Sequence, residues 1–264
     1  MSDDGANRAQ EHGVPVPNGA AEGAFVGVVE WMRDLAREIK NLRIALVEPD
    51  RIAFRPGQTI RLRVPVEAGG KEVYRNYSIA NPPDDEGAVE LIIRRAPGGL
   101  STTWIFERLR VGEQVRFLGP FGRFGLSESS LPMIWVAGGS GVSPLWSMLR
   151  HMRNRGIRRP CTFFFGAATV ADMPLRKELR QMERELDWFR FAPTVERLDD
   201  GQEWDGDIGL VTEVVERQVQ GGQPVEAYLC GPPGLIEAAV LVLTGKGVPP
   251  DHIHVDKFLS QRSL

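Results

Sequence analysis

The first half of the chain contains short stretches in which apolar and polar positions partly alternate. They are rich in β-branched residues and are separated by proline and glycine, a pattern typical of strands bounded by turns. The stretches lie at 26–31, 60–66, 73–79 and 89–95. One helix is predicted at 101–109, with Ser101 as its N-cap. Many short strands separated by turns predict an antiparallel barrel or sandwich, and we expect a β-barrel over residues 25–127.

The pattern changes near residue 128, where short apolar runs begin to alternate with amphipathic segments. The apolar runs, expected as strands, lie at 132–139, 161–167, 188–195, 225–231 and 252–258. The amphipathic segments, expected as helices, lie at 144–156, 175–186, 210–219 and 235–247. Strands that alternate with helices form βα units, so we expect an α/β nucleotide-binding domain with a parallel sheet over 128–264.

Composition agrees with a folded protein and excludes some functions. Of the 264 residues 42% are apolar, which is enough for a sizeable core. The net charge of −3 and the lack of a strongly basic region argue against a nucleic-acid partner. No apolar run is long enough to span a membrane and no secretory signal is visible, so a cytoplasmic protein is expected. Residues 1–24 are rich in Gly, Ala, Asn, Pro and acids, which predicts a disordered tail.

The chain has two cysteines, Cys161 and Cys230, and four histidines. Two thiols cannot hold an iron–sulfur cluster and provide no disulfide framework, so both are expected to be reduced. No metal-binding spacing accompanies the histidines, and no metal site is predicted. His252 and His254 are expected to be polar or hydrogen-bonded residues near a strand.

Two glycine-rich segments could bind phosphate groups. Residues 138–144, GGSGVSP, follow a predicted strand and open a helix, where small residues and unpaired N–H groups suit a pyrophosphate. Residues 98–103, GGLSTT, open the predicted barrel-domain helix and offer similar groups. Taken alone, the first could be a tight turn and the second a plain N-cap.

Two further motifs lie on predicted strands. In RNYS, residues 75–78, Arg75 could bind phosphate, Tyr77 could stack on a flat ring and Ser78 supplies a hydroxyl. The other interpretation is an ordinary strand with Tyr77 in the core. CGPP, residues 230–233, ends a predicted parallel strand, where ligands of such sheets bind. Cys230 would then face the ligand, or else be a buried small residue before a turn.

The order of these motifs resembles the ferredoxin–NADP reductase superfamily. The resemblance also rests on GPFGRF at 119–124, FFGAAT at 164–169 and DKF at 256–258, and it extends over residues 25–258. It is greatest to reductase components of bacterial aromatic and hydrocarbon oxygenases, and it includes the flavin domain of the sodium-pumping NADH:quinone reductase.

The resemblance implies FAD on the barrel and a nicotinamide nucleotide on the α/β domain. Arg75 would hold the flavin phosphates, Tyr77 would lie against the isoalloxazine, and Ser78 would hydrogen bond near N5. The pyrophosphate would be bound by Gly99, Ser101 and Thr102. The nicotinamide nucleotide would be bound by Gly138, Gly139, Gly141, Pro144, Cys230, Gly231 and Pro232, with Phe258 bordering the flavin.

In this family the protein positions two cofactors, and hydride passes from nicotinamide C4 to flavin N5. The residues expected to act there are Tyr77, Ser78 and Cys230. Relatives often carry a fused [2Fe–2S] domain, for which this sequence lacks the cysteines. Electrons are therefore expected to pass to a separate protein or to a small acceptor, and a separate ferredoxin, iron–sulfur or oxygenase component is favoured.

The choice of nicotinamide cofactor depends on residues after the second α/β strand. Relatives often have a basic residue where this chain has Ala168, and neither Ala168 nor Thr169 offers a cation for a 2′-phosphate. NADH is therefore expected, although Arg176 or Lys177 could reach a phosphate. The function expected overall is an FAD-dependent NADH reductase. The alternatives are a non-catalytic flavin-bearing subunit of a larger complex and a reductase of free flavin.

Overall fold

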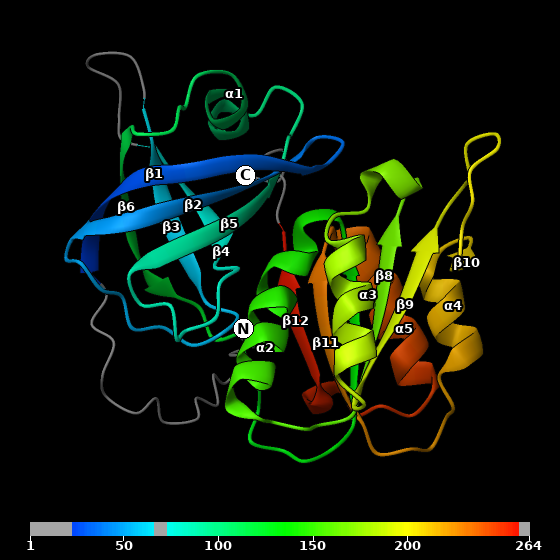
Figure 1. The fold of residues 1–264 in the computed structure, drawn as a ribbon. Helices are drawn as coiled ribbons and strands as arrows, with labels where there is room; N and C mark the ends of the chain where they lie inside the picture. Colours follow the sequence, from blue (N-terminus) through cyan, green and yellow to red (C-terminus); the bar gives the residue numbers. More distant parts are fainter. Residues whose placement is uncertain (1–22, 66–72, 259–264) are drawn as a thin grey trace, which may run out of the picture.

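The computed structural model describes residues 23–65 and 73–258, which form two six-stranded sheets side by side (Figure 1). The first sheet is antiparallel, with strand order β4-β3-β6-β1-β2-β5. Its strands are β1 (Gly23–Ala36), β2 (Ile39–Glu48), β3 (Thr59–Val64), β4 (Val73–Ser78), β5 (Ala88–Arg94) and β6 (Gln114–Phe121). The expected antiparallel barrel-like sheet is confirmed.

Alternation along these strands creates the barrel core. Ile60 and Leu62 on β3 are fully buried, and the intervening Arg61 is exposed. The same alternation places Leu42 and Ile44 of β2 in the core. The strands β2 and β6 were not among the four predicted, because charged residues such as Arg43 interrupt their apolar pattern.

Two local expectations need correction. Helix α1 spans Leu100–Glu107 and its N-cap is Gly99, so Ser101 lies inside the first turn and is not the cap. The tail expected to be disordered through residue 24 lies outside the described residues up to 22. Gly23 and Ala24 already belong to β1, where they pair with Gly119 and Leu118 of β6.

The second sheet is parallel, as expected, and its strand order is β10-β9-β8-β7-β11-β12. Its strands are β7 (Met133–Gly138), β8 (Cys161–Ala167), β9 (Phe189–Val195), β10 (Asp207–Ile208), β11 (Glu226–Gly231) and β12 (Ile253–Lys257). The helices are α2 (Val142–Arg155), α3 (Arg176–Glu185), α4 (Val211–Gln218) and α5 (Pro233–Gly245). Short 3-10 turns at Gly139–Gly141, Val170–Asp172 and Pro250–His252 complete it.

Helices cover both faces of this sheet (Figure 1). On the face covered by α2 and α3, Trp135 packs edge-on against Phe163 and Tyr228. Trp146 of α2 belongs to the same core, so both tryptophans are packing residues. Among the described residues, no helix is long and apolar enough to cross a membrane.

Helix α2 lies against the barrel and fixes the two sheets relative to each other. Ile39 and Ile92 of the barrel share a buried cluster with Trp146. Beside them, Glu90 accepts hydrogen bonds from Arg43 of the barrel and Arg150 of α2. A buried apolar contact with a paired carboxylate at its edge gives the two domains a defined orientation.

The segment between β6 and β7 is anchored at the amino ends of the parallel strands β7 and β11. Glu226 Oε2 accepts hydrogen bonds from Ser127 Oγ at 2.6 Å, Arg159 Nη2 at 2.7 Å and Tyr228 OH at 2.9 Å. Burial alone would raise the pKa of Glu226, but these three donors outweigh it and lower the pKa to about 2. The interdomain segment is thus held by an ionised, almost fully buried carboxylate.

Both histidines near the last strand have partners. His254 stacks on Tyr228 with ring centroids 4.6 Å apart, and burial lowers its pKa. His252 Nδ1 lies 3.3 Å from the carbonyl oxygen of Val225. These contacts agree with the expectation that they are structural polar residues.

Candidate functional site

The barrel side of the candidate site is built where β4 meets α1. Tyr77 of β4 and Ser101 of α1 join their hydroxyls in a 2.7 Å hydrogen bond. Burial raises the pKa of Tyr77, while the Ser101 hydrogen bond and the charge of Arg75 oppose that rise. Tyr77 therefore stays neutral at physiological pH and presents an aromatic ring next to a helix start.

Arg75 and the start of α1 supply polar groups around Tyr77. Arg75 Nη1 donates to the carbonyl of Tyr74 at 2.8 Å, and Arg75 has further contacts. Thr102 Oγ1 accepts from the N–H of Ala96 at 3.1 Å and lies 3.2 Å from the carbonyl of Gly99. The hydroxyl of Thr102 thus closes the loop before α1, whereas the backbone N–H groups of the first turn have no helical partner.

A second cluster crosses from the barrel to the parallel sheet. Ser78 Oγ, at the end of β4, donates to Asp256 Oδ2 of β12 at 3.4 Å. Cys230 Sγ, near the end of β11, lies 3.9 Å from the same carboxylate oxygen. Burial raises the pKa of Asp256, and the hydrogen bonds from Ser78 and Cys230 oppose it. Burial, with the nearby Asp256, raises the pKa of Cys230 well above its ordinary value, so the thiol stays protonated.

The glycine-rich loop after β7 packs directly on the CGPP motif. A Cβ added at Gly141 would lie 2.2 Å from the carbonyl oxygen of Cys230. A Cβ at Gly138 would lie 2.9 Å from the Leu235 side chain. Gly231 has φ +150°, a conformation that favours glycine. The glycines are therefore required by close packing of two βα turns at one sheet edge.

The remaining predicted residues surround this edge. Pro144 is buried in the first turn of α2, and Pro232 is the N-cap of α5. The N–H of Phe258 donates to the carbonyl of Gly231 at 3.1 Å. The structure thus gathers the predicted nicotinamide residues at the carboxyl edge of the parallel sheet, where such sheets bind ligands.

Two residues at this site were not identified from sequence. Asp256 joins Ser78 and Cys230, although DKF had been noted only as part of the resemblance. Arg94, the last residue of β5, lies against the glycine loop, with Nη1 3.1 Å from a Cβ built at Gly139. No sequence signal marked Arg94, because the domain seam that brings it to the loop is a tertiary feature.

The arrangement fits a flavin and a nicotinamide dinucleotide. Gly138 and Gly141 leave no room for side chains, and the loop they flank opens α2, so backbone N–H groups can approach a pyrophosphate there. Ser78 of the barrel and Cys230 of the parallel sheet meet at Asp256, as two cofactors that must meet would require, and Tyr77 precedes Ser78 on β4. Among the described residues, no group of three His, Cys, Asp or Glu side chains is placed to hold a metal ion.

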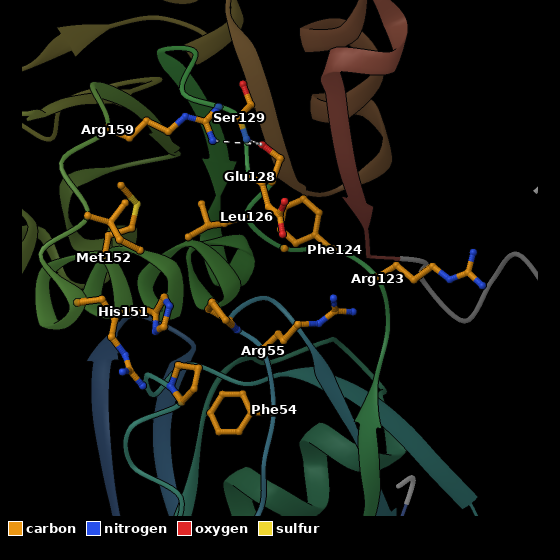
Figure 2. A pocket seen from close by; sticks show the side chains of 16 residues that line it. Phe54, Arg55, Arg123, Phe124, Leu126, Glu128, Ser129, His151, Met152 and Arg159 are labelled. Carbon is orange, nitrogen blue, oxygen red and sulfur yellow. Dashed lines mark hydrogen bonds between the residues drawn. The ribbon is translucent and has the colours of Figure 1, made fainter. Parts of the chain in front are cut away.

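A separate pocket of about 620 Å³ lies at the other end of α2. Figure 2 shows it between the linker residues Phe124 and Leu126 and the α2 residues His151 and Met152, with Arg55 from the barrel. None of the residues predicted to bind FAD or nicotinamide lines it. It is therefore distinct from the candidate site.

The residues that bear on the nicotinamide cofactor lie after β8. Arg176 contacts Asp205 Oδ1 at 3.1 Å and lies over the Trp204 ring at 5.0 Å. Thr169 Oγ1 donates to Asp172 Oδ2 at 2.6 Å. This edge therefore presents the Asp172 carboxylate, and Arg176 is already paired. Two more arginines border it: Arg37 Nε lies 4.0 Å from Asp172 Oδ1, and the N–H of Arg197 donates to the Ala168 carbonyl at 3.2 Å.

Known families match both halves of the chain. The family described as oxidoreductase FAD-binding domain matches residues 27–125, and the oxidoreductase NAD-binding domain matches residues 135–240. The reductase of an Amycolatopsis cytochrome P450 has the same fold, with a TM-score of 0.81 and 30% identity over 91% of this chain and 71% of that one. The chain belongs to the ferredoxin reductase family. It has an FAD-binding and an NAD-binding domain, as the sequence predicted.

Other members of the ferredoxin reductase family are similar over most of this chain. The reductase component of propane 2-monooxygenase from Mycolicibacterium goodii is 35% identical over 85% of this chain and 64% of its own length. The electron transfer component of xylene/toluene monooxygenase from Pseudomonas putida is 33% identical over 89% of this chain and 65% of its own. The chain thus spans slightly less than two thirds of these relatives.

Proposed function

We propose that the protein is an FAD-dependent NADH reductase that passes electrons to a separate redox partner. The observation that carries this proposal is the meeting of Ser78, Cys230 and Asp256 beside the glycine loop of α2. They join the flavin-domain strand β4 to the carboxyl edge of the nucleotide domain. Two-domain convergence of this kind serves a reaction between two bound cofactors.

The barrel domain, residues 25–127, would bind the flavin. Tyr77, fixed by Ser101, would support the ring, and Arg75 with the first turn of α1 would bind the phosphates. FAD supplies the hydride-accepting atom when bound. Ser78 would donate a hydrogen bond toward that atom in place of the one that it donates to Asp256.

The residues of the α/β domain, 128–264, would hold the nicotinamide nucleotide. Gly138, Gly139 and Gly141 would give the pyrophosphate access to the backbone, and Arg94 would reach it from the barrel. Cys230 and Gly231 would border the nicotinamide, with Phe258 closing the site. Because burial raises the pKa of Cys230, its thiol would act as a neutral packing group and not as a nucleophile.

NADH is proposed over NADPH because the residues that directly follow β8 supply no cation, although the exposed Arg197, whose N–H donates to the Ala168 carbonyl at 3.2 Å, borders the same edge. Ala168 carries no charge, and Arg176 is paired with Asp205 and stacked on Trp204. Asp172 adds a carboxylate there, which would repel a 2′-phosphate.

The electron acceptor is proposed to be a separate ferredoxin, iron–sulfur or oxygenase component. Several relatives are named as reductase or electron transfer components of monooxygenases, which supports an acceptor of this class. The two cysteines, both free and buried, support a role in the reducing cytoplasm.

The experiment is anaerobic stopped-flow mixing of the purified yellow protein with NADH, followed by a second mix with ferricyanide. Rapid flavin bleaching and stoichiometric reoxidation by this one-electron acceptor are expected. Lack of bleaching would instead indicate a non-catalytic flavin subunit. Loss of the flavin spectrum on dialysis would indicate a reductase of free flavin.

A further inference from the structure

Ser143 and Ser147 lie one turn apart on α2, and both hydroxyls hydrogen bond across the domain seam. Ser143 Oγ donates to the carbonyl oxygen of Ser78 at 3.2 Å. Ser147 Oγ donates to the carbonyl oxygen of Asn81 at 2.6 Å. Residues four apart share one helix face, so a single face of α2 fixes two nearby carbonyls of the barrel. All four residues are buried, so bulk solvent does not supply a substitute donor.

The two hydrogen bonds end at carbonyls in different surroundings. Asn81 is held independently, because its side chain bonds the carbonyls of Asp85 and Ala88 and the N–H of Glu90. The hydrogen bond from Ser147 therefore ends at a turn whose conformation is already held by hydrogen bonds within the barrel.

Ser78, in contrast, belongs to the candidate site. Its own hydroxyl bonds Asp256, and Ser143 holds its carbonyl from the start of α2, directly after the Gly139–Gly141 turn. The Ser143 bond thus connects the loop proposed to hold the nicotinamide nucleotide with the strand end proposed to face the flavin.

We propose that Ser143 is a positioning residue for hydride transfer, which fixes the Ser78 strand end relative to the nucleotide loop. This inference rests on the proposed function. Hydride transfer requires the donor and acceptor atoms in near-attack geometry, so a displacement of a fraction of an ångström lowers its rate. Without the Ser143 hydroxyl, the Ser78 carbonyl keeps its link to β5 through the Ile79–Leu91 bridge but loses its donor from the nucleotide domain, so the strand end can shift relative to α2.

The test uses an isosteric pair, Ser143→Thr and Ser143→Val, with Ser147→Ala as the matched seam control. Threonine and valine have the same shape, so any steric cost at this buried position is common to both variants. Each FAD-loaded protein is mixed anaerobically with NADH or NADH deuterated at C4, and the limiting rate of flavin bleaching is measured.

For Ser143→Val we expect a limiting rate about tenfold below that of Ser143→Thr and a larger deuterium isotope effect, with the Kd for NADH within about twofold. Ser147→Ala should retain the wild-type rate and isotope effect. Equal rates for the valine and threonine variants would overturn the positioning role. So would an equal slowing in Ser147→Ala, since that would indicate a general effect of seam stability. Failure of the wild type to be bleached would instead overturn the proposed function.

Discussion

The Ser78 hydroxyl lies 3.4 Å from Asp256 Oδ2, so the end of a barrel strand is hydrogen bonded to the last strand of the parallel sheet. These residues are far apart in sequence, and each belongs to a different domain. Asp256 is thereby placed beside the one barrel hydroxyl proposed to face the flavin. A half-buried carboxylate in this position gives the site a titratable group.

Asp256→Asn tests whether this carboxylate supports flavin reduction. Burial raises the pKa of Asp256, so the wild-type rate should fall as the pH drops through a value above the ordinary 3.8. In Asp256→Asn the rate at neutral pH should be about tenfold lower and this acid limb should be absent. The measurement is a pH profile of the limiting bleaching rate with NADH. An acid limb that persists unchanged in the variant would exclude Asp256 as its source.

Arg94 is expected to bind the nicotinamide nucleotide from the barrel side. Its Nη1 lies against Gly139, and among the described residues it has no ion-pair partner. Arg94→Ala should raise the Kd for NADH about tenfold, because a charge-assisted phosphate contact is lost. Its neighbour Arg95, paired with Glu107 and Glu38, is the control, and Arg95→Ala should leave the Kd unchanged. An equal rise of the Kd for NADH in both variants would show a general effect of surface charge and would contradict a specific role of Arg94.

Gly141→Ala should disrupt the nucleotide edge. The added Cβ would meet the Cys230 carbonyl at 2.2 Å, so the loop or the CGPP turn must move. A loss of about 2 kcal/mol in unfolding free energy and a loss of NADH binding are expected. Gly234, at the same sheet edge with no atom within 4 Å of its Cβ position, provides the control. Chemical denaturation should show no loss of unfolding free energy for Gly234→Ala. An unfolding free energy equal to that of the wild type for Gly141→Ala would contradict the packing argument.

Glu226 should stabilise the fold in a pH-dependent way. Its pKa falls from 4.5 to about 2 on folding, so its contribution, about 3 kcal/mol, is complete above pH 4.5 and is lost as the pH falls toward 2. Urea denaturation should show Glu226→Gln much less stable than wild type at pH 7, with a smaller difference at pH 3. Exposed Glu216→Gln should change stability by less than about 0.5 kcal/mol. If the difference in unfolding free energy between wild type and Glu226→Gln is the same at pH 7 and pH 3, the lowered pKa of Glu226 is not the source of the stabilisation.

The sequence predicted the architecture well because the hydrophobic period differs between the two halves. The runs at Met133–Gly138 and Cys161–Ala167 are bounded by glycines and amphipathic helices, so strand type and order followed. The strand Ile39–Glu48 was missed, because Asn41 and Arg43 face the domain seam and break the alternation. A buried polar residue at an interface carries no periodic signal.

The candidate site was predicted motif by motif, without the contacts that join the motifs. Tyr77, Ser78 and Cys230 were named from local patterns and from the family resemblance. Asp256, Arg94 and Ser143 contact residues of the other domain, so their proposed roles depend on how the two sheets pack. The local sequence determines the conformation of each loop. Which side chains of the two domains come into contact depends on how the domains pack against each other.

Anaerobic titration of the flavin-loaded protein with NADH and, in parallel, with NADPH tests the central claim most directly. The proposal predicts complete bleaching of the flavin absorbance by an equimolar amount of NADH, and much slower bleaching by NADPH. A protein that binds no flavin, or whose bound flavin stays oxidised with excess NADH, would contradict it.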